Sequence, residues 1–145
     1  MKKKDFITSA FDTKQKDSLP LFLSPVQAGF PSPADDYIEE SLDLNKYLIS
    51  HPSATFFVRV QGNSMIDAGI HNQDILIVDR ALNPTNGKIA IAVINGEFTV
   101  KRIRIKKNKK IFLEPQNPSY SLIEISPDDD FQIWGIVTYV IHKAF

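Results

Sequence analysis

The sequence lacks cysteine, net charge and any long apolar run, and each absence excludes a class of function. Without cysteine, the chain has no disulfides, thiolate nucleophile or cysteine-ligated zinc, and a reducing cytoplasm suits it. Seventeen basic and seventeen acidic residues cancel, so the chain as a whole is not attracted to nucleic acid or to an anionic membrane. No run approaches the roughly 18 apolar residues that span a bilayer. We expect no membrane contact.

The N-terminal residues do not have the pattern of a signal peptide. Their basic start, "MKKK", is followed by the charged residues Asp5, Asp12, Lys14 and Lys16, where export requires an uninterrupted apolar segment. We therefore expect a cytoplasmic protein. Its 145 residues suffice for one domain with a hydrophobic core and a tail.

Residues 1–36 are predicted to form an extended N-terminal arm, and residues 37–145 a β-rich domain. Four of the nine prolines lie in "SLPLFLSPVQAGFPSPADD", which disfavours a long helix or a central strand. The same segment is rich in apolar residues that would be unfavourable in water, so the arm is expected to dock on another surface. These residues are Leu21, Phe22, Leu23, Val26 and Phe30.

The next segment, "DDYIEESLDLNKYLISH" at 35–51, is predicted to form one short amphipathic helix. Its apolar residues recur every three to five positions, acidic residues stand at its start, and Pro52 follows its end. After Pro52 the apolar period falls to two. Seven short strands then follow, and Asn95-Gly96 marks a tight hairpin. The predicted fold is mainly β: a strongly bent antiparallel domain with the arm and one helix attached.

Lys101 and Ser64, both in this β region, are a candidate pair of general base and nucleophile. In "EFTVKRIRI" alternation puts Lys101 on the same face as Ile103 and Ile105, which is the expected core side of the strand. The lysine could extend its charged end into water, or it could be desolvated and therefore uncharged often enough to act as a general base. Ser64, in the turn-like "QGNSM", could be its nucleophile or a structural hydroxyl. Spacing alone leaves both questions open.

Several motifs together resemble the LexA-type self-cleaving serine peptidases. They are "GNSM", "DILIVDR", "GKIAIAVINGEFTVKRI", "LEPQNPSY" and "IWGIVTYVI", and the match extends from Thr55 to the end of the sequence. The resemblance implies the bent LexA-type Ser/Lys peptidase fold, with Ser64 as nucleophile and Lys101 as general base. It also implies an oxyanion site at the backbone amides of Asn63 and Ser64. No cofactor or metal is implied.

The arm is similar to that of the SOS-mutagenesis members of the family, whose scissile bond matches Ala28-Gly29. Such members cleave themselves when a RecA filament on single-stranded DNA promotes the reaction. The shortened product acts as a homodimer with an error-prone translesion polymerase, a UmuC-like subunit, in DNA damage tolerance. Only 28 residues precede Gly29, too few for the helix-turn-helix domain of the repressors, so sequence-specific DNA binding is not expected.

Some features depart from the family or allow other interpretations. Relatives commonly carry Gly-Asp before the "ILIVDR" strand, where this sequence has Asn72-Gln73-Asp74, so we expect a changed turn. "KKNKK" at 106–110 is interpreted as a solvated hairpin tip, with contact to nucleic acid or a polymerase as the alternative. His51, His71 and His142 are scattered singly, which favours neither a zinc site nor a catalytic triad. The alternative functions are a noncatalytic β-rich adaptor and a LexA-like repressor fragment.

Overall fold

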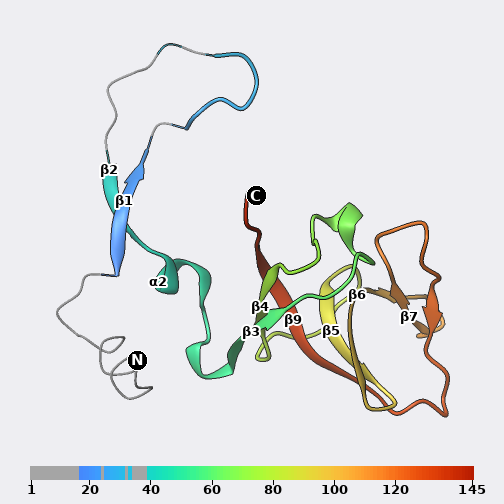
Figure 1. Ribbon diagram of the computed structural model, residues 1–145. Coiled ribbons are helices and arrows are strands. Elements are labelled where there is room, and N and C mark those ends of the chain that lie inside the picture. Colours follow the sequence, from blue (N-terminus) through green and yellow to red (C-terminus); the bar gives the residue numbers. More distant parts are fainter. Residues whose placement is uncertain (1–16, 24, 32, 34–38) are drawn as a thin grey trace, which may run out of the picture. The chain divides into compact units, whose positions relative to one another are not determined.

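The computed structural model describes residues 17–23, 25–31, 33 and 39–145, in two compact units, Met1–Ser50 and His51–Phe145 (Figure 1). In the first unit, strands β1 (Ser18–Phe22) and β2 (Glu39–Asp43) form a two-stranded antiparallel sheet. A short helix of five residues, α2 (Leu44–Leu48), follows β2 directly. The arm therefore contains a strand that ends shortly before Ala28 and Gly29.

The helix predicted for residues 35–51 is wrong over most of its described length. Residues 35–38 lie outside the described part of the chain, and the next five form β2, which pairs with β1. The helix begins only after Asp43, whose carboxylate accepts the N–H groups of Asn45 and Lys46 and so caps it. Pairing with β1 supplies hydrogen bonds that the local apolar spacing cannot reveal. The helix ends before Pro52, as expected.

In the second unit, seven antiparallel strands form one sheet in the order β3-β4-β9-β5-β6-β7-β8. Each corresponds to a strand expected from the alternating sequence pattern, so the mainly β fold is confirmed. A short 3₁₀ helix, Pro52–Ala54, leads into the first strand, and another, Ile66–Ala68, follows Ser64. The strands are β3 (Thr55–Arg59), β4 (Ile75–Asp79), β5 (Ile89–Ile94), β6 (Glu97–Ile105), β7 (Ile111–Glu114), β8 (Ile123–Glu124) and β9 (Phe131–Ile141).

The long strand β9 lies between β4 and β5 and carries two irregularities that bend the sheet. Its register shifts once against β5 and once against β4, which leaves Trp134 and Thr138 as the extra residues on β9. Such bulges increase local twist. Between them, Gly135 lies so close to β4 that an added Cβ would be 2.6 Å from Val78 Cγ1. Only glycine fits this approach without a shift of the Val78 side chain.

The hairpins form where the sequence predicts them. Asn95 and Gly96 join β5 to β6 with φ values of 49° and 83°, the left-handed pair typical of a tight two-residue turn. "KKNKK" is the exposed tip between β6 and β7, which confirms that interpretation of residues 106–110. No helix within the described residues is long and apolar enough to cross a membrane.

The core of the second unit fixes the loop that carries Ser64. The larger cluster joins residues of β4 and β5 to Met65 and Ile70, which are 1% and 0% exposed. Both belong to the loop between β3 and β4. Burying two large apolar side chains stabilises this loop by several kcal/mol, at about 1.5–3 kcal/mol for each side chain. The polar stretch around Ser64 is therefore attached to the core, unlike a free linker.

Candidate active site

Ser64 lies in a loop whose entry requires glycine. Gly62 has a φ of +97°, a conformation that other residues rarely adopt, and its N–H donates to Asn72 Oδ1 at 2.8 Å. Immediately after Ser64, the Met65 carbonyl accepts the N–H groups of Ala68 and Ile70. The serine hydroxyl is thus held between a sharp turn and a buried anchor.

A second segment, the "PQNP" stretch after β7, fixes the same loop from the other side. Gln116 N–H donates to the Ser64 carbonyl and the Gln116 carbonyl accepts from Asp67 N–H, both at 2.8 Å. The Asn117 side-chain amide donates to the Asn63 carbonyl at 2.9 Å. Sequence reasoning did not assign a role to Gln116 or Asn117. The only signal was that both lie inside the quoted motif "LEPQNPSY".

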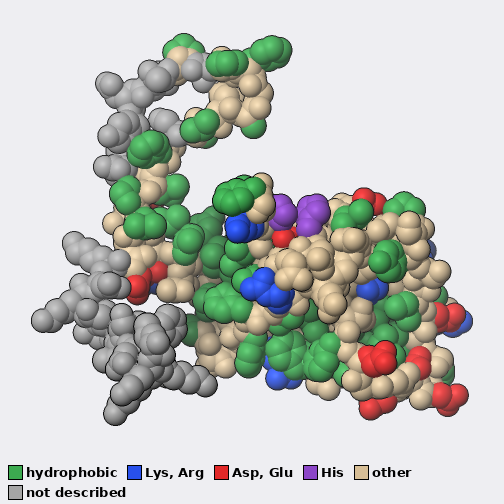
Figure 2. All heavy atoms as spheres, in the orientation of Figure 1, with side chains coloured by type: hydrophobic (Ala, Val, Ile, Leu, Met, Phe, Trp, Pro, Cys, Tyr) green, Lys and Arg blue, Asp and Glu red, His purple; other side chains and the backbone are tan. Residues whose placement is uncertain are grey.

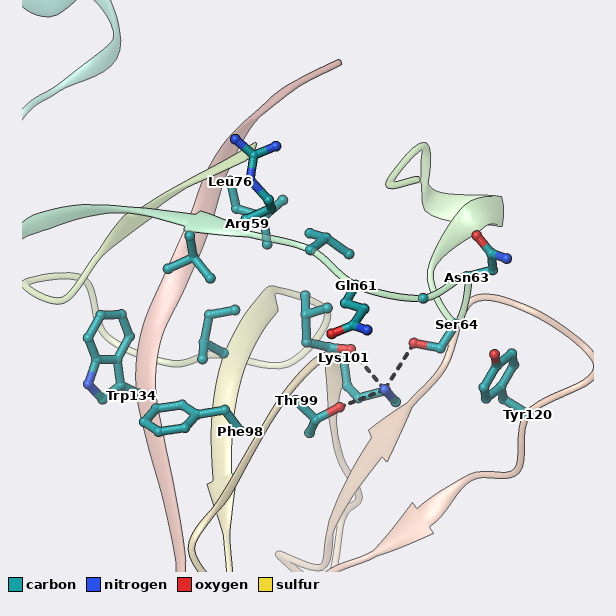
Figure 3. Close-up of a pocket in the computed structure, with 15 residues that line it drawn as sticks. Arg59, Gln61, Asn63, Ser64, Leu76, Phe98, Thr99, Lys101, Tyr120 and Trp134 are labelled. Carbon is teal, nitrogen blue, oxygen red and sulfur yellow. Dashed lines mark hydrogen bonds between the residues drawn. The ribbon is translucent and has the colours of Figure 1, made fainter. Parts of the chain in front are cut away.

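Lys101 extends from β6 to the Ser64 hydroxyl. Its Nζ lies 3.1 Å from Ser64 Oγ, 2.7 Å from Thr99 Oγ1 and 3.0 Å from the Val100 carbonyl oxygen (Figure 3). The lysine is 8% exposed, and within the described residues no carboxylate forms an ion pair with it. Burial without a counter-charge lowers the pKa of Lys101 below its ordinary value.

The three neighbours of Nζ suit an uncharged amine. The Val100 carbonyl can only accept a hydrogen bond, and Thr99 Oγ1 can accept the second N–H. The nitrogen lone pair is then directed at the remaining neighbour, the Ser64 hydroxyl, whose hydrogen it can accept. An ammonium would bury a full charge among neutral groups, which costs several kcal/mol. Burial among neutral groups therefore favours the uncharged form, which can act as a base.

A pocket runs from this pair along an apolar channel. Phe98 and Trp134 lie at one end, and Ser64, Asn63 and Tyr120 at the other (Figure 3). Its wall includes residues 58–62, which comprise the end of β3 and the segment leading to Ser64. β3 is also an edge strand of the sheet, so its outer side is open to an added strand. An extended apolar peptide fits such a site.

The other predicted site residues lie as follows. Ala28 and Gly29 are exposed, in the segment between β1 and β2. Within the described residues, the backbone amides of Asn63 and Ser64 donate no hydrogen bond, so both are free to bind an oxyanion. The Asn72–Asp74 turn does contain a left-handed residue, but it is Gln73, with a φ of 74°. Asn72 serves instead as the acceptor for Gly62.

The histidines do not belong to this pocket, but two of them are not isolated. None of His51, His71 and His142 is among the described residues that line it. The interpretation of the three as scattered singly is nevertheless wrong for His71 and His142, which converge on the buried carboxylate of Asp74. They are 71 positions apart in the sequence, so linear spacing could not reveal their proximity.

The site pairs a serine hydroxyl with the amine of a buried lysine at 3.1 Å, and the comparisons identify the family. The chain belongs to the Peptidase S24-like family, whose model matches residues 20–138. Protein ImpA of Salmonella typhimurium is 52% identical over 125 residues, covering 86% of this chain and 84% of ImpA. Protein SamA of Salmonella typhimurium strain LT2 is 49% identical over 129 residues, 89% of each chain.

A more distant relative connects the chain to the repressor branch. The LexA repressor of Pseudomonas chlororaphis is 37% identical over 134 residues, which cover 92% of this chain and 65% of the repressor. The similarity to UmuD-like SOS mutagenesis proteins, first inferred from the arm, is confirmed by the named relatives. This chain therefore has the S24 peptidase domain of both branches.

Proposed function

We propose that this protein is a serine peptidase that cleaves its own arm, residues 1–36, between Ala28 and Gly29, in the cytoplasm during the SOS response. The observation that carries the proposal is that Lys101 Nζ lies 3.1 Å from Ser64 Oγ while the lysine is only 8% exposed. A snorkelling lysine would extend its amine into water. A buried amine beside a serine hydroxyl is the arrangement that activates a nucleophile.

The proposed reaction proceeds through an acyl-enzyme. Neutral Lys101 takes the hydroxyl proton as Ser64 Oγ attacks the Ala28 carbonyl carbon, and the amides of Asn63 and Ser64 bind the oxyanion. The bond between the Ala28 carbonyl carbon and the Gly29 nitrogen breaks, and the lysine ammonium delivers its proton to that nitrogen. Lys101 then deprotonates a water molecule that attacks the Ala28 carbonyl carbon, and it returns this proton to Ser64 Oγ as the ester bond breaks. The products are residues 1–28 and a chain that begins at Gly29.

The arm is a suitable substrate for the pocket. Val26 and Phe30, on either side of the proposed bond, are 88% and 94% exposed, and Leu19 is 71% exposed. Such apolar side chains gain free energy when they enter an apolar channel like that beside Phe98 and Trp134. We propose that the segment docks as an added strand along the edge strand β3.

A tethered substrate needs regulation, because a high effective concentration makes cleavage fast whenever the arm is docked. We propose that a RecA filament on single-stranded DNA promotes the reaction by stabilising the docked arrangement of the arm. The shortened product then acts as a homodimer with an error-prone translesion polymerase, in DNA damage tolerance. The relatives named ImpA and SamA support this assignment, because they are UmuD-like SOS mutagenesis proteins.

The test is to incubate the purified chain at alkaline pH and to measure product masses. We expect two fragments whose masses place the cut between Ala28 and Gly29. Ser64→Ala and Lys101→Ala should each abolish the cut, because one removes the nucleophile and the other the base. Ser121→Ala and Lys107→Ala are matched controls, since both residues are exposed, and they should cleave like the unmodified chain.

An intact wild-type chain would contradict the proposal and favour the noncatalytic adaptor, whose exposed arm only docks on a partner. Cleavage that persists in Ser64→Ala or Lys101→Ala would assign the reaction to other groups. Circular dichroism of each variant separates loss of the chemistry from loss of the fold.

A further inference from the structure

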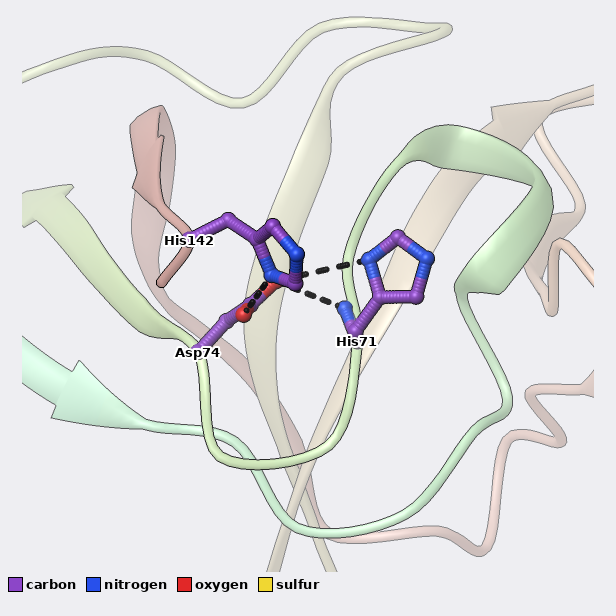
Figure 4. A group of neighbouring side chains, drawn as sticks. All are labelled: His71, Asp74 and His142. Atoms are coloured by element: carbon purple, nitrogen blue, oxygen red, sulfur yellow. Dashed lines mark hydrogen bonds and ion pairs between the residues drawn. The ribbon is translucent and has the colours of Figure 1, made fainter. Parts of the chain in front are cut away.

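A cluster of two histidines and an aspartate, side chains that can bind metal ions, lies outside the peptidase pocket, where β4 begins and β9 ends. Ile75 and Ile141 are paired in the antiparallel β4-β9 ladder. The residue before Ile75 and the residue after Ile141 are therefore neighbours, and these are Asp74 and His142. The turn before β4 brings His71 to the same carboxylate (Figure 4).

The three side chains are close and have different surroundings. His142 Nδ1 lies 2.6 Å from Asp74 Oδ1, and His71 Nδ1 lies 3.7 Å from Asp74 Oδ2. The two imidazole rings are 4.8 Å apart between centroids. The Asp74 side chain is 3% exposed, whereas those of His71 and His142 are 50% and 52% exposed. Figure 2 shows histidine side chains gathered at the surface of this domain.

We propose that His71, Asp74 and His142 form a binding site for a divalent transition metal ion of the zinc type. Two imidazole nitrogens and one carboxylate oxygen are a donor set that zinc prefers, with water in the fourth position. One ligand atom from each residue already lies within 4.8 Å of the others. Two ligands on one zinc ion lie roughly 3.3 Å apart, given bonds of about 2.0–2.1 Å.

Only small movements separate the present arrangement from a coordinating one. Asp74 is held in place, because its Oδ2 accepts the His71 backbone N–H at 2.7 Å and its own carbonyl accepts Val60 N–H at 2.8 Å. The two histidine rings are half exposed and can rotate about their side-chain bonds. The fixed carboxylate thus provides the base of the site, and the mobile rings close on the ion from the solvent side.

The rest of the molecule contains a matched control. His51 Nδ1 lies 2.6 Å from Oδ2 of the buried Asp79, with a histidine side chain that is 45% exposed. This pair has the same bond and a similar exposure as His142 with Asp74, but within the described residues no second imidazole joins it. A bound ion at the proposed site would join the turn, β4 and the segment after β9, and should stabilise the folded domain.

The test is calorimetric titration of the full chain with Zn²⁺, with parallel thermal melts. We expect one ion per chain and a higher Tm in the presence of Zn²⁺. His71→Ala and His142→Ala should each weaken binding by more than about 10-fold, because even outer-shell partners of metal ligands contribute about 10- to 100-fold. His51→Ala should bind like the unmodified chain. Mg²⁺, which requires oxygen ligands, should not bind.

Two further measurements sharpen the outcome. Co²⁺ in place of Zn²⁺ should give the visible absorption bands of a tetrahedral site in the wild type and not in either variant. Absence of Zn²⁺ binding by the wild type, or binding that is unchanged in both His71→Ala and His142→Ala, would overturn the proposal. The substituted histidines are exposed, so the variants should fold, which circular dichroism checks. The result does not depend on self-cleavage, because all three residues follow Gly29 in the sequence.

Discussion

At the scale of single residues, the proposed chemistry depends on a lysine that loses water without gaining a counter-charge. Lys101 meets only neutral partners, and its burial lowers its pKa. A carboxylate at the same distance would have restored the charged form. The two oxygens besides Ser64 Oγ orient the amine, so that its lone pair is directed at the serine.

Thr99 should therefore influence the reaction although it forms no bond to the substrate. Thr99→Val removes the hydroxyl that lies 2.7 Å from Lys101 Nζ. Besides Ser64, only the Val100 carbonyl then remains to orient the amine. A hydrogen bond contributes about 1 kcal/mol, so we expect self-cleavage to slow by roughly 5-fold. Thr99→Ser retains the hydroxyl and should restore most of the rate.

The control for this prediction is Thr138→Val. Thr138 also has a strand hydroxyl with a hydrogen bond, which it donates to the Ile77 carbonyl at 3.2 Å, but it does not line the pocket. First-order rates measured by gel densitometry distinguish the variants. Equal rates for Thr99→Val and Thr138→Val would show that Thr99 does not orient the lysine.

Much of this residue-scale picture could be predicted, because alternation along β6 already put Lys101 on the core face. That Ser64 meets it could not be predicted from periodicity, since the two are 37 positions apart and only the folded sheet brings them together. The family resemblance supplied that pairing. His71, Asp74 and His142 had no such guide, because their proximity results from the register of β4 and β9.

At the scale of elements, period-two strands were predictable and the segment before them was not. The strands of the second unit alternate, as β6 does, or form short apolar runs, as β4 does, so their signal is local. β2 instead depends on hydrogen bonds to β1. The spacing of apolar residues within 39–43 gives no sign of this partner strand. The helical spacing there is genuine, but cross-strand hydrogen bonds outweigh it until Asp43 caps α2.

The turn before β4 offers a prediction at this scale. Gln73 is left-handed with a φ of 74°, a conformation that costs a residue with a Cβ about 1 kcal/mol or more. Gln73→Gly removes this strain but makes the unfolded chain more flexible, which costs about 0.4–1 kcal/mol. We expect a net change within about 1 kcal/mol in favour of the folded state.

Gln73→Ala is the informative comparison, since it retains the Cβ and removes the rest of the side chain. In urea denaturation Gln73→Gly should be more stable than Gln73→Ala. If alanine is as stable as glycine, the left-handed backbone at residue 73 carries no strain. The backbone carbonyl of residue 73 accepts a hydrogen bond from Arg59 Nη1 at 2.9 Å. Because this acceptor belongs to the backbone, the wild type and both variants retain it.

At the scale of the whole molecule, the two units have separate roles in the proposed reaction. The second unit contains the serine, the lysine and the pocket, while the first contains the exposed bond to be cut. The balanced charge of the chain agrees with regulation by a protein partner better than with direct attraction to DNA. The length and composition of the sequence predicted one β-rich domain with an arm, but nothing in them could predict that a strand of the arm, β1, pairs with β2.

The pH dependence of the self-cleavage rate tests the central claim most directly. Lys101 must be neutral to act, and its pKa is lowered, so the rate should rise about 10-fold per pH unit while the amine is mostly charged. The rate should then level off at a pH below about 10.4, which is the ordinary pKa of lysine. A rate that is independent of pH, or one that climbs through that value without levelling, would contradict a desolvated lysine as the base.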